Sequence, residues 1–139
     1  MLGDYVVTTL AGSGSAGYAD GIGTAAIFYM PSYTAADTLS NLYVTEVGYH
    51  LVRKISSAGL VTTYAGSGAY SSEDGVGTTA TFRYPIGITI DTSGFLFIAD
   101  RNGNCVRKIS TSALVTTYAG SGSASYSDGI GTSDGAEVA

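Results

Sequence analysis

The stretch VVTTLAGSG at residues 6–14 returns as LVTTYAGSG at residues 60–68 and again at 114–122. The three copies are evenly spaced, and 23 of the 54 positions in 7–60 are identical in 61–114 without a gap. Chance cannot produce this agreement. The chain is therefore a tandem repeat, and repeats of this length are supersecondary units that stack on their neighbours.

The composition favours strands joined by tight turns. The 139 residues include 20 glycines and 11 tyrosines, no tryptophan, and only 12% charged residues. Threonine, tyrosine and valine suit pleated strands, while glycine suits the turns between them. The mean hydropathy is positive, which argues against a disordered chain.

Each repeat shows the pattern of four short strands. In the second copy, PIGITID at 85–91 is apolar enough for a strand buried on both faces, and turns rich in Gly, Asn and Ser separate the segments that follow. Four antiparallel strands joined in order, with a long link to the next four, make a β-propeller blade. We therefore predict an all-β fold with strands near 32–37, 42–46, 50–55 and 60–65, and with four more at the equivalent positions of the second copy, near 86–91, 96–100, 104–109 and 114–119.

The domain organisation follows from the repeat. We expect an outer strand and Gly-rich link at 1–30, a first blade at 31–66, a link at 67–84, a second blade at 85–120, and a Gly/Ser-rich tail at 121–139. The inner strands occur twice but the outer VTT strand occurs three times, which predicts two blades plus one extra outer strand.

The unit resembles the NHL repeat in its bacterial form. The matching stretches are AGSGSAGYADGIGTAAIF (11–28), NLYVTE (41–46), HLVRKI (50–55), PIGITID (85–91), GFLFIAD (94–100) and CVRKI (105–109). The Asn-His-Leu triplet that names the family is replaced here by Tyr49-His50-Leu51 and by Gly103-Asn104-Cys105, so no ligand site is carried over. The resemblance implies a propeller fold. Enzymes with NHL-like propellers, among them an amidating lyase and lactonase-like hydrolases, place His, Asp or Glu around a metal in the central channel.

Several residues recur at equivalent positions and are candidates for defined roles. Phe28 and Phe82, followed by Pro31 and Pro85, precede the first inner strand of each blade, and we expect each Phe to fill the space between adjacent blades. Asp20, Asp74 and Asp128 precede a Gly in each link and suit Asx turns; calcium ligation is the alternative, although it needs several oxygens per ion. In Arg53-Lys54 and Arg107-Lys108 we expect one residue of each pair to meet an acid such as Glu46 or Asp100.

The sequence argues against several classes of function. A net charge of −5 disfavours nucleic acid as a partner. A single Cys and a single His, with only Glu46 close to that His in sequence, give no catalytic or metal constellation, so we expect no enzyme activity and no cofactor. No apolar run is long enough for a membrane helix. An extracellular or cell-surface setting is favoured, although the start, MLGDYVVTTL, lacks the features of a signal peptide.

The expected function is that of a structural or binding module. Two isolated blades would leave apolar faces and strand edges open to water, which favours association. We expect copies to associate head to tail, as a ring or a filament, and a protein or carbohydrate ligand is a further possible partner. The alternative is a fragment of a larger propeller, either a lyase or lactonase-like enzyme or a ligand-binding protein. The terminal strands expected to make the contact carry Val7, Thr8, Thr9, Val115, Thr116 and Thr117.

Overall fold

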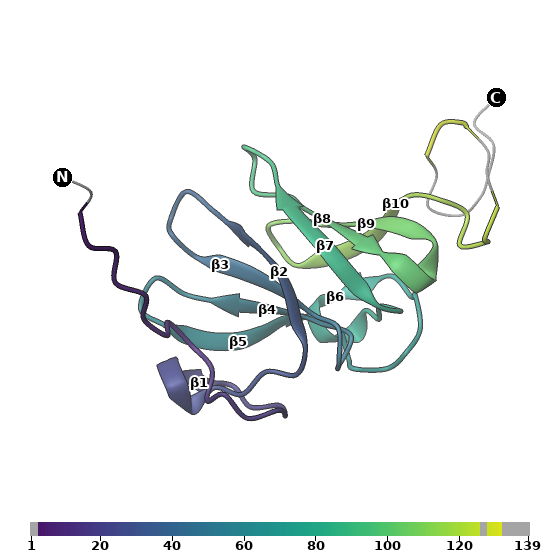
Figure 1. Ribbon diagram of the computed structural model, residues 1–139. Helices are drawn as coiled ribbons and strands as arrows, with labels where there is room; N and C mark the ends of the chain where they lie inside the picture. The colour runs from purple at the N-terminus through teal and green to yellow at the C-terminus, as the bar shows by residue number, and fades with distance from the viewer. Residues whose placement is uncertain (1–2, 126–127, 132–139) are drawn as a thin grey trace.

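Two antiparallel sheets of five strands lie next to each other in the computed structural model, which describes residues 3–125 and 128–131 (Figure 1). The first sheet holds β1 (Gly21–Ile22), β2 (Pro31–Ala36), β3 (Leu42–Glu46), β4 (Leu51–Ile55) and β5 (Leu60–Ala65). The second holds β6 (Gly75–Val76), β7 (Pro85–Ile90), β8 (Leu96–Asp100), β9 (Cys105–Ile109) and β10 (Leu114–Ala119). Three single-turn 3-10 helices are η1 (Gly23–Ala25), η2 (Gly77–Thr79) and η3 (Arg101–Gly103).

The strand order is the same in both sheets, β1-β5-β4-β3-β2 and β6-β10-β9-β8-β7. The four long strands of each sheet follow one another in the chain, and we call them blade 1 (β2–β5) and blade 2 (β7–β10). The innermost strands β2 and β7 lie beside each other (Figure 1). The predicted all-β fold with propeller-type blades is confirmed.

The short strands β1 and β6 come from the segments expected to be only links. We call these segments link 1 (residues 12–30) and link 2 (residues 66–84). In link 1, Gly21 pairs with Val61 and Ile22 with Leu60, and link 2 repeats the arrangement on β10. Each link therefore adds a fifth strand to the outer edge of the blade that follows it, and this covers backbone groups that an outer strand would otherwise expose.

The outer strand expected at 7–12 is not formed, which corrects the sequence-based prediction. Residues 7–10 run away from blade 1 without strand pairing (Figure 1), and Val7 is 95% exposed. The same VTT sequence forms β5 and β10, where β4 and β9 supply hydrogen-bond partners. A strand needs a neighbour for its backbone donors and acceptors, and residues 7–12 have no neighbouring strand among the described residues.

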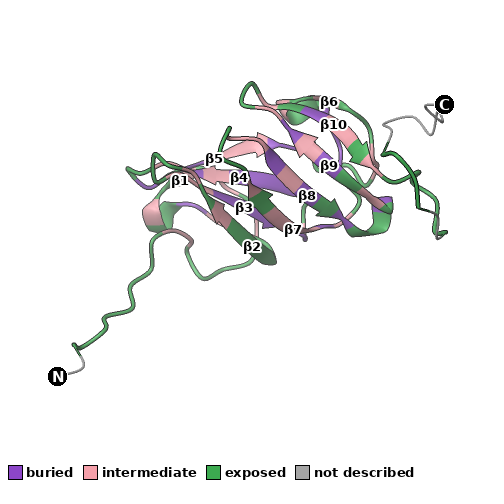
Figure 2. Cartoon of the chain, turned by 90° about the horizontal axis from the view of Figure 1, so that it is seen from above, coloured by how far each residue is buried: buried purple, intermediate pink, exposed green. Residues whose placement is uncertain are grey.

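The main core lies between the two blades. We call the side of a blade that faces its preceding link the back face, and the opposite side the front face. Buried residues from the front face of blade 1, from link 2 and from the back face of blade 2 form one cluster. Figure 2 shows buried stretches, in purple, in the strands of both blades. Its members are Tyr43, Val52, Ala65, Ala80, Phe82, Leu96, Ile98, Ile109 and Val115. A smaller cluster on the back face of blade 1 contains Ala26, Val44, Ile55 and Val61.

The two phenylalanines differ in burial although they hold equivalent positions. Phe82 is fully buried in the cluster shared by the two blades, whereas Phe28 is half-buried against blade 1 alone. The prolines follow the same trend, since Pro85 is buried and Pro31 is exposed. Link 2 lies between two blades and link 1 borders only one, which accounts for both differences.

We expect Phe82→Ala to lower the free energy of unfolding by roughly 3–5 kcal/mol, because it removes a large buried side chain and leaves a cavity between the blades. Phe28→Ala, the matched variant in link 1, should lower the free energy of unfolding by less, because Phe28 is already in contact with solvent. Urea denaturation followed by circular dichroism measures both values. A loss below about 1 kcal/mol for Phe82→Ala would contradict the interblade position.

Candidate functional site: a buried arginine network and an open blade face

A fully buried arginine stands at the back of blade 1. In the segment VRKI the side chains alternate, so Val52 faces forward while Arg53 points back toward link 1. Arg53 donates from Nη1 to Glu46 Oε2 at 2.7 Å and from Nη2 to Asp20 Oδ1 at 2.7 Å. It also donates to the carbonyl oxygen of Ala19 at 3.0 Å. The guanidinium therefore joins link 1 to the blade.

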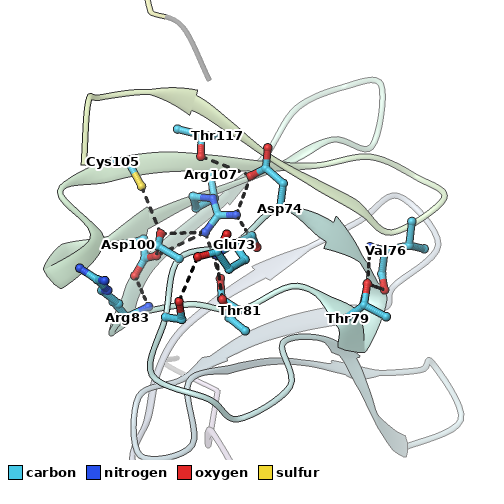
Figure 3. A network of polar contacts seen from close by, with 12 residues as sticks. Glu73, Asp74, Val76, Thr79, Thr81, Arg83, Asp100, Cys105, Arg107 and Thr117 are labelled. Atoms are coloured by element: carbon cyan, nitrogen blue, oxygen red, sulfur yellow. Dashed lines mark hydrogen bonds and ion pairs between the residues drawn. The ribbon is translucent and has the colours of Figure 1, made fainter. Parts of the chain in front are cut away.

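Blade 2 repeats the network around Arg107 (Figure 3). Nη2 donates to Asp74 Oδ1 at 2.8 Å and to the carbonyl oxygen of Glu73 at 3.0 Å. Nη1 lies 3.6 Å from Asp100 Oδ2 and donates to the carbonyl oxygen of Thr81 at 3.0 Å. Arg107 and Asp100 are both buried, so each charge depends on the other and on these hydrogen bonds.

The two networks differ in one matched pair of residues. In blade 1 the acid is Glu46, and Tyr18 of link 1 lies with its ring centroid 4.8 Å from the guanidinium carbon of Arg53. In blade 2 the acid is the shorter Asp100, and Ser72 replaces the tyrosine; Ser72 accepts from Arg107 at 3.0 Å and donates to Asp100 at 3.0 Å. The serine hydroxyl thus bridges the gap that the shorter carboxylate leaves.

The link aspartates were predicted from sequence as turn residues, with calcium ligation as the alternative. The structure places Asp20 and Asp74 in ion pairs with the buried arginines, and each also lies within hydrogen-bond distance of a threonine of the outer strand, Thr63 or Thr117. Asp128 lies exposed at the same register in the third link. Within the described residues no three His, Cys, Asp or Glu side chains gather to hold a metal.

The predicted pairing of one residue of each Arg-Lys pair with Glu46 or Asp100 is confirmed for Arg53 and Arg107. Sequence reasoning missed their second partners, the link aspartates. The signal was present, because Asp20 and Arg53 recur together at the equivalent positions of the next copy, as Asp74 and Arg107. The lysine that follows each arginine lies over aromatic rings instead; Lys108 Nζ is 4.0 Å from the ring centroid of Phe95.

Burial shifts the pKa of the acids in these networks. Loss of solvent raises the pKa of Glu46, although the hydrogen bond and charge of Arg53 oppose this shift. Loss of solvent likewise raises the pKa of Asp100, opposed by the backbone N–H of Arg83, by Ser72 and by Arg107. Both carboxyl groups are fully buried beside the arginines.

His50 lies in the turn after β3 with a left-handed backbone, at φ 56°. Asn104 takes the equivalent position in blade 2 at φ 52°. The His50 Nδ1 atom is buried and finds no hydrogen-bond partner among the described residues, and Tyr70 packs on the ring at 5.1 Å. Burial lowers the pKa of His50, although the charge of Asp100 opposes this shift.

The front face of blade 2 is the largest difference between the blades. In blade 1, Tyr43 is 7% exposed and Val52 is 0% exposed, because blade 2 and link 2 cover them. In blade 2, Val106 holds the position of Val52 and is 36% exposed, and the neighbouring Tyr118 is 52% exposed. We call Phe97, Val106, Tyr118 and Ala119 the open face. Among the assembly residues predicted from sequence, Val115 is buried, whereas Thr116 and Thr117 are half-buried beside β9.

A shallow groove recurs beside the end of each outer strand. The groove of blade 1 has a volume of about 380 Å³ and is bordered by Tyr18, Tyr49 and Thr63. The equivalent groove of blade 2 has a volume of about 360 Å³ and is bordered by Ser72, Gly103 and Thr117 at the same registers. The two tyrosines make the first groove aromatic and amphipathic.

Comparison with known proteins gives a repeat family and a set of similar folds. The NHL repeat matches residues 82–109. A protein of unknown function from Bacteroides thetaiotaomicron is similar at 30% identity and a TM-score of 0.61, over 77% of this chain and 27% of that one. A putative phosphatase from the same organism is similar at 27% identity and a TM-score of 0.61, over 69% of this chain and 24% of that one.

An auxiliary nutrient binding protein from Bacteroides thetaiotaomicron shares the fold at 23% identity and a TM-score of 0.55, over 68% of this chain and 26% of that one. This chain spans about a quarter of the length of each of these three proteins. No curated protein sequence matches significantly. Across the described residues, no helix has the length and apolar character that crossing a membrane requires.

We expect Arg107→Met to lower the free energy of unfolding by about 3–5 kcal/mol, because the buried Asp100 would lose its counter-charge. Lys108→Met is the matched control on the same strand, and it should cost clearly less because Lys108 has no ion-pair partner within the described residues. Urea denaturation measures the free energy of unfolding of both variants. Equal losses would show that the network does not hold the blade together.

We expect the chain to lose stability as the pH falls below the ordinary His value of 6.5, because the unfolded chain takes up a proton before the folded chain with its lowered His50 pKa. His50→Asn, which copies Asn104, should reduce this loss. The urea midpoint at pH 7.5 and at pH 5.5 measures the difference for both proteins. An identical pH dependence would show that His50 is not responsible.

Proposed function

Because the chain carries an NHL repeat within propeller-type blades, we propose that it is a non-catalytic module that associates head to tail with further copies of itself. The observation that carries the proposal is the contrast between Val52 and Val106. They hold the same position on equivalent strands, yet Val52 is 0% exposed and Val106 is 36% exposed. The open face therefore carries side chains whose equivalents in blade 1 are buried, and covering it with a second copy is favourable.

The two ends of the chain are complementary. The front face of blade 1 packs on link 2 and on the back face of blade 2 within the chain. The open face of blade 2 presents the same side chain types as that front face, and the back face of blade 1 presents those of the back of blade 2. Blade 2 of one copy therefore fits blade 1 of the next, with link 1 between them.

A specific hydrogen bond supports the same geometry. Within the chain, the Tyr64 hydroxyl donates to the carbonyl oxygen of Ser110 at 3.2 Å across the blade interface. The residues at the matching registers are Tyr118 and Ser56. In the proposed contact the Tyr118 hydroxyl of one copy donates to the Ser56 carbonyl oxygen of the next.

The contact joins two different faces, so it repeats until a ring closes or a filament grows. Three copies would supply six blades, which lies within the usual range of propellers. A closed ring covers every open face and is favoured over a filament for that reason.

A second candidate is a segment of a longer propeller, and the short coverage of the similar structures favours it. Further blades of the same chain would then cover the open face, and the activity or ligand would belong to the whole ring. The aromatic groove beside Tyr18 and Tyr49 suits a protein or carbohydrate ligand under either arrangement.

We expect Val106→Arg to dissociate the assembly, because a charged side chain would be buried without a partner in the contact. Leu39→Arg is the control, since Leu39 is a 74% exposed apolar side chain in the turn between β2 and β3, away from the open face. Native mass spectrometry and light scattering give the mass of each protein. A parent chain that stays monomeric and folded at high concentration contradicts self-association and favours the longer propeller.

A further inference from the structure

The two terminal segments of the chain are nearly interchangeable in sequence. Residues 7–24 and 115–132 are identical at 15 of 18 positions. Residues 7–24 match the middle copy, 61–78, at only 11 of 18. The first and third copies are therefore variants of one segment, and the middle copy is a different variant.

One of the positions that separate these variants contacts the arginine network. Tyr18 lies over Arg53 and its hydroxyl is 2.8 Å from Thr63 Oγ1, and Tyr126 occupies the same register in the third copy. The middle copy has Ser72 there, which bridges Arg107 and the shorter Asp100. The third copy thus carries the side chain that suits the Glu46 and Arg53 pair of blade 1.

The third link leaves β10 with the same backbone conformation with which link 2 leaves β5. Gly120 and Gly122 have φ values of 100° and 77°, close to the 100° and 86° of Gly66 and Gly68. At Gly66 this turn is obligatory, because an added Cβ would lie 2.6 Å from the carbonyl oxygen of His50. Gly131 lies next to the carbonyl oxygen of Tyr118, as Gly77 lies next to that of Tyr64.

Two links cannot occupy one blade. Each link folds back on its own first residue, as Gly66 N–H donates to the Gly77 carbonyl oxygen at 3.1 Å and Gly12 N–H donates to the Gly23 carbonyl oxygen at 3.1 Å. In the proposed contact, β10 of one copy packs beside blade 1 of the next copy, which we call the acceptor. The third link, which follows β10, then starts at the place where link 1 of the acceptor also starts. Residues 7–10 of the acceptor then have no strand position to fill.

We propose that residues 119–132 of one copy replace residues 11–24 of the next copy on blade 1. This inference rests on the proposed head-to-tail association. Asp128 takes the place of Asp20 beside Arg53 of the acceptor, and Ile130 takes the place of Ile22 opposite Leu60. The two segments make chemically similar contacts, so replacing one by the other costs little free energy. After the exchange, the polypeptide runs from β10 directly onto the next blade.

The extent of the sequence match supports this boundary. After residue 132 the tail reads SDGAEVA and has no counterpart of Ala26 or Phe28. The acceptor's own Ala26 and Phe28 therefore stay in the small cluster on the back of blade 1. The repeating unit of the assembly runs over 25–132, which is the length of two sequence repeats.

Photo-crosslinking tests the exchange directly. A photoreactive phenylalanine analogue replaces Ile130 in one sample of the full chain and Ile22 in another; both side chains are exposed, at 76% and 68%. Each is mixed with isotope-labelled parent chain, and mass spectrometry identifies the linked peptides. We expect position 130 to link to β5 of a different copy, and position 22 to lose its link to β5 of its own chain as the assembly forms.

A charge variant gives a second readout. Asp128→Asn should weaken association by roughly tenfold, because the acceptor's buried Arg53 loses a charged partner. Asp4→Asn removes the same charge from the displaced N-terminal segment and serves as the control. An assembly in which position 22 keeps its link to β5 and position 130 forms none overturns the exchange and leaves head-to-tail association standing. A parent chain that forms no assembly overturns both.

Discussion

Each blade is built around one buried guanidinium. Arg53 and Arg107 sit behind the hairpin of β3–β4 or β8–β9 and reach backward to the link that precedes the blade. A buried positive charge requires an acid and further acceptors. These come from two segments: the neighbouring strand supplies one acid, and the link supplies a second acid and the backbone carbonyl oxygens. The link is therefore part of the blade it precedes. This dependence explains why Asp and Arg recur together and why β1 and β6 pair with the blade that follows them.

The same dependence gives the chain a direction. A blade takes its link from the N-terminal side and offers its front face to the C-terminal side, so the two faces of a blade are never alike. Blade 1 and blade 2 meet in this way through the cluster that contains Val52 and Phe82. The front face of blade 2 and the link-covered back of blade 1 have no neighbouring blade among the described residues, and two unlike faces of this kind suit a heterologous contact. The proposed association and the proposed exchange of links both follow from it.

The polar groups of the described residues are used to build blades. Glu46 and Asp100 pair with the arginines, and Asp20 and Asp74 attach the links. The aromatic groove near Tyr49 is a surface of a different kind, shaped by two ring faces and hydroxyl groups. The similar structures, of which this chain spans about a quarter, place the same fold in larger proteins.

The repeat, the four strands of each blade and the propeller class could be predicted from the amino-acid sequence. The gap-free period and the alternation of side chains are visible along the chain without knowledge of tertiary contacts. Only the tertiary structure decided which VTT segment becomes a strand: residues 7–12 and 61–66 are almost identical, but strand formation depends on a neighbour that lies far away in sequence. It also decided the role of the link aspartates, because the ion pair from Asp20 to Arg53 joins residues 33 positions apart. Burial of Val52 and exposure of Val106 follow from the same cause. Identical local sequences acquire different environments when a blade has a neighbour on one side and water on the other.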